Sequence, residues 1–300
     1  MAIIVQMKIG KIGLIVILIF GVCFSPISSL KAVTDWSKYH HQHFFAFNKA
    51  LLKNDLELQQ RGVVSVKRVS FATSMIPRFQ VNTLIEPALS FEDYVKKPIK
   101  MKVSQQIVFD QLDRYKKELT SSDTLILYSH THGIKNNFKE GEEWGGIILD
   151  VNGATLPHNG VTIWSDYANA LLAIPAKNVI VLVMACYSGG FIDYLNTIQD
   201  KWINRSKEGR NFLVITSQNN SLTSDPVRIK GELYNPFTAS VERALQGDAD
   251  GFLSGGPDGQ ITLEEFIGYI TTTTHQLDNR AFPQSIGSYD GKEVLFRLNP

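Results

Sequence analysis

Two apolar segments of the sequence end in residues that can carry out nucleophilic chemistry. "TLILYS" leads directly into "HTHG", which contains His130 and His132, and "NVIVLVM" leads directly into "ACYSGG", which contains Cys186. In a cysteine–histidine pair the imidazole takes the thiol proton, the sulfur attacks a carbonyl carbon, and the imidazolium then protonates the leaving amine. The sequence therefore predicts Cys186 as a nucleophile, with His132 or His130 as its base.

The small residues beside these side chains suit the same chemistry. Gly133 follows His132 directly, and a glycine lets a substrate approach the backbone closely, so we expect His132 rather than His130 to be the base. The backbone amides of Gly133 and Cys186 are the expected hydrogen-bond donors to an oxyanion. Residues 188–190, Ser-Gly-Gly, fit a tight turn and the start of a helix after the nucleophile.

The N-terminus and the cysteine content indicate the cellular location of the protein. Two lysines precede the apolar run 12–24, which is too short to span a bilayer comfortably, so residues 1–32 are predicted to be a secretory signal peptide. Its removal would take away Cys23 and leave Cys186 without a disulfide partner in the chain. We expect a secreted or periplasmic protein, with membrane contact only through an uncleaved signal segment. A buried, inert thiol is the alternative for Cys186.

Composition limits the classes of partner. The formal net charge of +1 and the sequence pI of about 7.8 lack the basic excess of a nucleic-acid-binding surface. With 44% hydrophobic residues, the 300-residue chain can bury a large core. The sequence thus predicts a globular protein that does not bind nucleic acid.

The first predicted elements follow from the spacing of apolar residues. This spacing predicts an amphipathic helix over residues 35–62, and the alternating valines of 63–72 predict a strand. Residues 75–102, which are rich in proline and lysine, are predicted to form a long surface connection. A second helix is predicted over residues 104–123, with Ser104 as its N-cap.

Further along the chain, predicted strands alternate with predicted helices. Strands of the buried type are predicted at 124–129, 178–184 and 212–217, a hairpin at 145–164, and helices at 165–175 and 191–202. Such alternation is typical of a parallel sheet with right-handed crossovers, so we expect residues 33–300 to form one α/β domain. Functional residues of these sheets gather beyond the carboxyl ends of the strands, where His132 and Cys186 meet if their strands are neighbours.

The two motifs resemble the His-Gly and Ala-Cys blocks of the caspase-like (clan CD) cysteine peptidases, which include caspases, metacaspases, gingipains and legumains. The pattern H-G, spacer, A-C-x-S-G is most similar to the legumain type, and the caspase signature likewise places the histidine about 50 residues before the cysteine. The resemblance covers most of the mature chain. It implies a caspase-like three-layer α/β/α sandwich with a mostly parallel central sheet. It also implies His132 as general base and acid, Gly133 as an oxyanion contributor and Cys186 as the nucleophile.

The substrate side chain is not specified by this resemblance. In the legumain and metacaspase patterns an acidic residue two positions before the cysteine helps to read the substrate's P1 side chain. Here that position is Met184, so the resemblance does not imply asparaginyl or basic P1 specificity. The polar segment "ITSQNNSLTSD" lies where this family builds its pocket walls. Asp225 is a candidate for the missing pocket charge and Ser217 for a lining residue, and an ordinary polar loop is the alternative.

A segment near the C-terminus, residues 247–270, resembles the second half of an EF-hand loop. "DGQITLEEF" has carboxylates at two ligand positions and a glycine at the sharp turn, whereas the first half of the loop does not match. The candidate ligands of a structural calcium ion are Asp248, Asp250, Asp258 and Glu265. The alternative is a capped helix start, in which Asp258 and Thr262 satisfy helix amides.

These observations predict an exported cysteine endopeptidase that cleaves a peptide or protein substrate through a thioester acyl-enzyme and needs no cofactor for its chemistry. The alternative is a catalytically inactive caspase-like module, retained for binding or for calcium-dependent association. An α/β-hydrolase with a cysteine nucleophile and His275 as base fits less well. Its nucleophile elbow needs glycines at two positions where this chain has Met184 and Ser188.

Overall fold

The computed structural model describes most of the chain from residue 42 onward. The described residues are 42–49, 56–74, 76, 79–85, 103–135, 145–149, 161–229, 232–253, 255–289 and 291–298. The predicted signal peptide, residues 1–32, lies outside these ranges.

A six-stranded sheet forms the centre of the fold. Its strands are β1 (Gln42–Asn48), β2 (Phe79–Ile85), β3 (Thr124–His130), β7 (Asn178–Met184), β8 (Asn211–Thr216) and β12 (Gln284–Ser288). They lie in the order β12-β8-β7-β3-β1-β2, in which β12 is antiparallel to β8 and the other neighbouring pairs are parallel. Because β3 and β7 are neighbours, the segments that follow them leave the sheet at the same edge.

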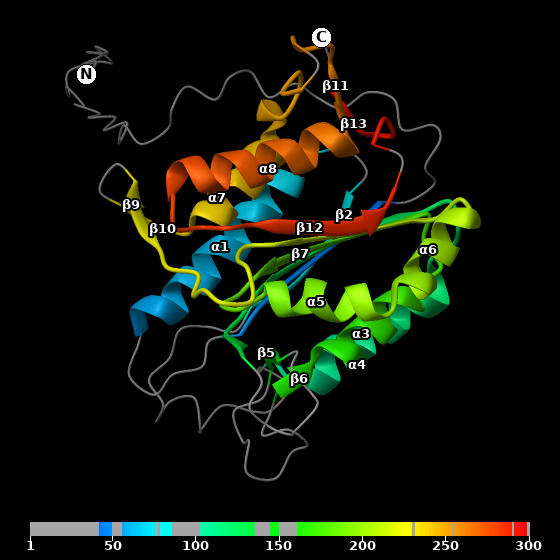
Figure 1. Cartoon of the computed structure of the whole chain (residues 1–300), viewed down its shortest axis with the longest axis horizontal. Helices are drawn as coiled ribbons and strands as arrows, with labels where there is room; N and C mark the ends of the chain where they lie inside the picture. The colour runs from blue at the N-terminus through cyan, green and yellow to red at the C-terminus, as the bar shows by residue number, and fades with distance from the viewer. Residues whose placement is uncertain are drawn as a thin grey trace, which may run out of the picture. The chain divides into compact units, whose positions relative to one another are not determined.

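Helices cover both faces of this sheet (Figure 1). One face carries α1 (Leu56–Ser74), α7 (Pro236–Arg243), the π-helical turn η3 (Ala244–Asp248) and α8 (Leu263–Leu277). The other face carries α3 (Gln105–Glu118), α4 (Trp164–Leu172), α5 (Gly189–Thr197) and α6 (Gln199–Lys207). The fold is therefore a three-layer α/β/α sandwich with a mostly parallel central sheet, as predicted.

Smaller sheets lie outside the central layer. The first contains β4 (Gly133–Ile134), β5 (Gly146–Ile148) and β6 (Val161–Ile163), in which β5 and β6 are the antiparallel strands of the predicted hairpin. The others pair β9 (Val227–Ile229) with β10 (Glu232–Tyr234), and β11 (Gln260–Thr262) with β13 (Val294–Arg297). The β4 strand starts at Gly133, so one of these small sheets begins at a candidate site residue.

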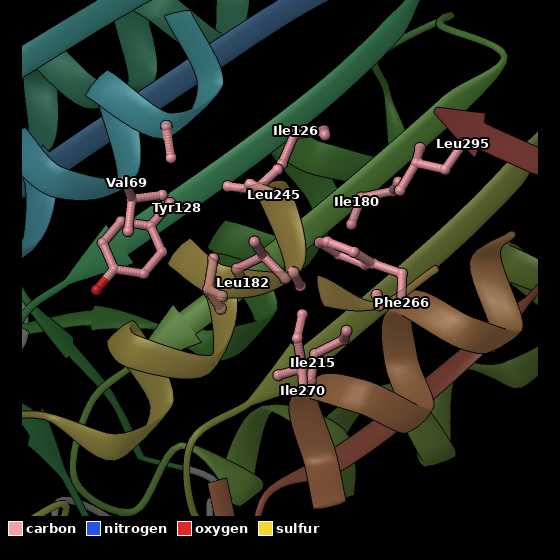
Figure 2. Close-up of a cluster of buried hydrophobic side chains, with 14 of the residues drawn as sticks. Val69, Ile126, Tyr128, Ile180, Leu182, Ile215, Leu245, Phe266, Ile270 and Leu295 are labelled. Carbon is pink, nitrogen blue, oxygen red and sulfur yellow. The ribbon is translucent and has the colours of Figure 1, made fainter. Parts of the chain in front are cut away.

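The core lies on both faces of the sheet, because successive side chains of a strand point to opposite sides. On the α1 and α8 face, a buried apolar cluster joins the strands to the helices (Figure 2). Its labelled members are Val69, Ile126, Tyr128, Ile180, Leu182, Ile215, Leu245, Phe266, Ile270 and Leu295. On the opposite face, Leu127 and Val181 of the same strands pack with Tyr115, Trp164 and Phe191. Both faces of β3 and β7 are thus held, and their carboxyl ends are fixed relative to each other.

The helix predicted over residues 35–62 is wrong for residues 42–48, which form strand β1, and correct for residues 56–62, which begin helix α1. Residues 35–41 and 50–55 lie outside the described residues. All seven side chains of β1 are buried, since the strand lies inside the sheet with helices on both faces. A strand buried on both faces has no polar alternation, and its run of phenylalanines then matches helical spacing as well as strand spacing.

The strand predicted over residues 63–72 is also wrong, because these residues lie within helix α1. Val63, Val66 and Val69 are buried, whereas Val64 is 41% exposed. The buried positions therefore follow a helical repeat, and the valine content of the segment reflects one packed helix face rather than a strand.

The remaining elements agree more closely with the sequence. Strands β3, β7 and β8 fall where they were predicted, and Ser104 caps α3 by accepting a hydrogen bond from the Ile107 amide. The long surface connection predicted over 75–102 is wrong for residues 79–85, which form strand β2 of the central sheet, and residues 86–102 lie outside the described residues. The helix predicted over 191–202 is divided between α5 and α6. In the described part of the chain, no helix is long and apolar enough to cross a membrane.

Candidate active site

The His-Gly and Ala-Cys segments lie side by side at the carboxyl edge of the sheet. His130 pairs with Met184 in the β3–β7 register, so His132 and Cys186 stand the same number of residues beyond the paired ends. The Thr131 amide donates a hydrogen bond to the Met184 carbonyl (3.1 Å). The backbone contact continues past the strand ends, because a Cβ built on Gly133 would overlap the carbonyl oxygen of Cys186 and lie 2.8 Å from its carbonyl carbon.

The two candidate bases have different environments. His130 is 8% exposed, and burial together with the nearby charges of His132 and Arg61 lowers its pKa to about 3. At neutral pH its imidazole is therefore uncharged. His132 is half-buried, and its carbonyl accepts a hydrogen bond from the Ile148 amide of β5 (2.9 Å), which fixes the backbone at this position. A neutral imidazole can accept a proton, but the lowered pKa makes His130 a weak base and its ring is nearly enclosed. The greater accessibility of His132 therefore favours His132 as the group that exchanges protons with a substrate.

Cys186 is a half-buried free thiol whose sulfur accepts a hydrogen bond from the Ser224 amide (3.4 Å). Burial raises the pKa of this thiol, the Ser224 amide opposes the rise, and the negative charge of Asp225 adds to it. In the absence of substrate the sulfur is therefore held as a thiol. A neighbouring base must take its proton before it attacks a carbonyl carbon.

The backbone after Cys186 is a tight turn held by the loop that follows β8. Tyr187 has a φ of 52°, a left-handed conformation that is unfavourable for a residue with a side chain, and its amide donates a hydrogen bond to the Leu222 carbonyl (2.9 Å). Helix α5 begins at Gly189, where a Cβ would lie 2.5 Å from the Asn220 amide nitrogen. The turn and the loop are therefore packed backbone against backbone, which fixes where the thiol points.

Ser217 contacts the residues on either side of Cys186 and Tyr187. It is 1% exposed, its hydroxyl accepts a hydrogen bond from the Ala185 amide (3.2 Å), and it lies within hydrogen-bond distance of the Ala185 carbonyl (3.1 Å) and of the Ser188 hydroxyl (3.4 Å). Its predicted role was to line the substrate pocket. In the structure its contacts position the residue before Cys186.

The other two residues predicted to bind substrate occupy opposite environments. Met184 is 7% exposed and belongs to the buried cluster on the α1 and α8 face. Asp225 is exposed and close enough to Cys186 and Arg280 to influence the pKa of both groups. Of these two side chains, Asp225 is the one that a substrate can reach.

Sequence reasoning did not single out Ser224 or Asn235. The Ser224 amide contacts the sulfur, and the Asn235 side-chain amide donates a hydrogen bond to the Ser224 hydroxyl (3.3 Å). A backbone amide leaves no signal in residue type. The Asn-Pro pair at 235–236 does give a sequence signal, because this pair is typical of a helix start. Asn235 indeed caps α7.

The four predicted calcium ligands are engaged in local hydrogen bonds. Asp248 accepts from Arg243 (2.9 Å), Asp250 from the Asp258 and Gly259 amides (2.9 and 3.2 Å), Asp258 from the Gln260 amide (2.9 Å), and Glu265 from the Gly251 and Thr262 amides (3.1 and 2.9 Å). Thr262 and Glu265 form a capping box at the start of α8. Within the described residues, no cluster of three or more histidine, cysteine or acidic side chains is arranged to hold a metal ion. Calcium binding here stays a prediction.

Comparison with known proteins gives no functional assignment. No protein-family model matches the chain, and no curated protein matches it. Among solved structures, the chain is similar to the crystal structure of protein GSU0716 from Geobacter sulfurreducens, at 13% sequence identity and a TM-score of 0.46. The similarity covers 87% of this chain and 100% of that chain. Function must therefore be argued from the residues of the site.

Asp225→Asn is expected to make Cys186 more reactive. The substitution removes a negative charge that disfavours the thiolate, so the pKa of Cys186 falls and more thiolate is present at pH 7. Since Asp225 is exposed, we expect alkylation by iodoacetamide at pH 7 to accelerate by about threefold at low ionic strength, and by less in high salt. Asp200→Asn, at an exposed position on α6, is the matched control. If the alkylation rate depends on pH in the same way for Asp225→Asn and for the unsubstituted protein, Asp225 does not act on the thiol.

Proposed function

We propose that the protein is a caspase-like cysteine endopeptidase in which His132 and Cys186 form the catalytic dyad. The observation that carries this proposal is the contact of Gly133 with the Cys186 carbonyl, because it sets the His-Gly and Ala-Cys segments against each other at the carboxyl edge of the sheet. The three-layer fold implied by the family resemblance supports the same proposal. The signal-like N-terminus supports export of the enzyme.

The proposed reaction proceeds in two steps. His132 takes the proton of Cys186, the sulfur attacks the scissile carbonyl carbon, and the oxyanion accepts hydrogen bonds from the backbone amides of Gly133 and Cys186. Collapse of this intermediate forms a thioester and expels the amine, which takes its proton from the His132 imidazolium. Water deprotonated by His132 then attacks the thioester and releases the acid product and the thiol.

The environment of the Cys186 thiol determines when the reactive thiolate forms. The free enzyme holds Cys186 with a raised pKa, so a substrate that brings His132 and the thiol into hydrogen-bond contact would create the thiolate where it is used. The Ser224 amide then donates to the developing negative charge. The raised pKa favours a nucleophile that reacts with a bound substrate over one that reacts indiscriminately.

Covalent labelling tests the proposal directly. A mixture of peptidyl acyloxymethyl ketones with varied side chains is incubated with the full chain, and adducts are located by mass spectrometry of tryptic peptides. We expect an adduct on Cys186, its loss in Cys186→Ala, and peptide cleavage that disappears in the same variant. Ser188→Ala, which removes a neighbouring hydroxyl and keeps the thiol, should still be labelled. If no peptidyl electrophile modifies Cys186 in the folded protein, the peptidase proposal is wrong and the non-catalytic binding module becomes the better description.

A further inference from the structure

A buried glutamine joins two loops beside the candidate nucleophile. Gln218 comes just after β8 and is 2% exposed. Its side-chain nitrogen donates to the carbonyls of Thr223 (3.1 Å) and Arg280 (3.3 Å), and its side-chain oxygen accepts from the Phe282 amide (2.9 Å). The nitrogen meets two acceptors and the oxygen meets a donor, so these partners fix the orientation of the side-chain amide.

The bond to Thr223 reaches the thiol through one peptide group. The Thr223 carbonyl and the Ser224 N–H belong to the same peptide, which is planar and trans, so the two groups point in opposite directions. Gln218 contacts the carbonyl end of this peptide, and the Cys186 sulfur contacts the N–H end (3.4 Å). The direction of the Ser224 N–H is therefore tied to the hydrogen bond from Gln218.

The same bond strengthens the donor that faces the sulfur. Hydrogen bonds in a chain polarise one another, so donation from Gln218 to the carbonyl makes the N–H at the other end of the peptide a better donor. Burial raises the pKa of the Cys186 thiol, and the Ser224 amide opposes this rise. Gln218 thus acts on the group that stabilises negative charge on the sulfur.

Other contacts hold this loop without acting on this peptide group. The Tyr187 amide donates to the Leu222 carbonyl (2.9 Å), which belongs to a different peptide. Asn235 donates to the Ser224 hydroxyl (3.3 Å), which is a side-chain atom. These bonds fix where the loop lies, whereas the bond from Gln218 fixes how the peptide is turned.

Gln218 is itself anchored to the sheet and to the turn after the nucleophile. Its backbone amide donates to the hydroxyl of Ser188, two residues after Cys186 (3.2 Å). The segment of Arg280 and Phe282 comes just before β12, which pairs with β8 at the edge of the central sheet. The side-chain amide is therefore held in place before any substrate binds.

We propose that Gln218 is a positioning residue that turns the Thr223–Ser224 peptide so that the Ser224 N–H donates to the Cys186 sulfur. The proposal rests on the proposed function, since it takes Cys186 as the nucleophile whose developing negative charge this N–H stabilises. Gln218 acts through the peptide, so the role needs no contact between Gln218 and the substrate.

Alkylation of Cys186 by iodoacetamide tests the proposal on the full chain. The rate is followed across the titration of the thiol by mass spectrometry of the tryptic peptide that contains Cys186. Gln218→Met keeps the length of the side chain and removes its hydrogen bonds, so we expect the midpoint of the rate profile to move to higher pH. We expect the rate at pH 7 to fall about threefold, and kcat/KM for peptide cleavage to fall by a similar factor.

Gln106→Met is the matched control. Gln106 is exposed on α3 and donates a hydrogen bond to Asp110 (2.7 Å), so this variant also loses a hydrogen bond of a glutamine side chain. We expect the alkylation profile of Gln106→Met to be that of the unsubstituted protein. A shift of equal size in both variants contradicts a specific role for Gln218.

The sign of the shift separates positioning from a general loosening of the loop. Since burial raises the pKa of the Cys186 thiol, a loop that merely opens lets water reach the sulfur and moves the midpoint to lower pH. Loss of the Ser224 donor moves it to higher pH. A midpoint that is unchanged or lower in Gln218→Met therefore overturns the proposal.

Nuclear magnetic resonance on the unsubstituted protein answers the same question if Gln218→Met does not fold. With isotope-labelled glutamine and serine, we expect the Ser224 amide proton and the Gln218 side-chain amide protons to shift with the same midpoint as Cys186 alkylation. The Gln106 side chain should not shift. If Ser224 shifts and Gln218 does not, the two groups are not linked through the peptide and the proposal is wrong.

The peptidase proposal can fail separately from this inference, because alkylation requires no substrate. A higher midpoint in Gln218→Met, together with an absence of peptide cleavage, supports the role of Gln218 at the thiol and counts against the peptidase. Cleavage that depends on Cys186, together with an unchanged midpoint in Gln218→Met, overturns the role of Gln218 and leaves the peptidase proposal standing.

Discussion

Replacing His132 by alanine is expected to lower kcat/KM for peptide cleavage by about 10²- to 10⁴-fold, the contribution usual for a general acid–base group. The thiol of Cys186 has a raised pKa, so without an imidazole beside it little thiolate is available at neutral pH. The leaving amine also loses its proton donor. His132 is only half-buried, so we expect the free energy of unfolding to change by less than about 1 kcal/mol. Steady-state kinetics and urea denaturation measure the two quantities separately.

His130→Leu is the control for this substitution. The His130 ring is buried, and its Nδ1 has no hydrogen-bond partner among the described residues, so an apolar side chain can occupy the same space. Since the pKa of His130 is about 3, this imidazole is a poor acceptor for the thiol proton at neutral pH. We expect His130→Leu to keep activity within about tenfold of the parent and to keep the same pH profile. If His130→Leu loses activity as His132→Ala does and also changes the pH profile, His130 is the base and the present assignment is reversed.

Gly133→Ala is expected to be the most damaging conservative change near the site. The added methyl group would overlap the Cys186 carbonyl oxygen and lie 2.8 Å from its carbonyl carbon, so the two backbones must separate. A displacement of about 1 Å between catalytic groups can cost about 10²-fold in rate, and overpacking typically costs about 1–3 kcal/mol in stability. We expect both losses, measured by kcat/KM and by the midpoint of urea unfolding.

Gly256→Ala provides the matched glycine control. Gly256 is exposed, and a Cβ built there has no atom within 4 Å, so the same chemical change should leave activity and stability nearly unaltered. If Gly133→Ala is as well tolerated as Gly256→Ala, the close contact between the His-Gly and Ala-Cys backbones does not exist in solution. The observation on which the proposed function depends would then be lost.

Much of the central fold could be predicted from local patterns. The strands at 124–130, 178–184 and 211–216 are short apolar runs bounded by polar residues, and Ser104 is a typical N-cap before a periodic helix. The order of strands and helices then indicated a parallel sheet. These features depend on residues close together in the sequence, and pattern reasoning is reliable for such features.

The N-terminal elements could not be predicted in this way. Strand β1 is buried between β2 and β3, and its identity as a strand depends on these distant neighbours rather than on its own periodicity. In α1, the exposed Val64 beside the buried Val63 reveals the helical repeat only once burial is known. Tertiary contacts thus decided both elements against their local sequence preference.

Some features of the candidate site could likewise be predicted from the sequence, and others depend on tertiary contacts. The sequence by itself determined the candidate reactive residues, His132 and Cys186, and the adjacent glycine, because the proposed chemistry would require those side chains at the ends of apolar strands. Only the tertiary structure decided that Ser217 supports the backbone before the thiol, that the Ser224 amide contacts the sulfur, and that Arg61 lines a cavity. These contacts join segments far apart in the chain. Their geometry depends on how the sheet and helices pack, and no local pattern encodes that packing.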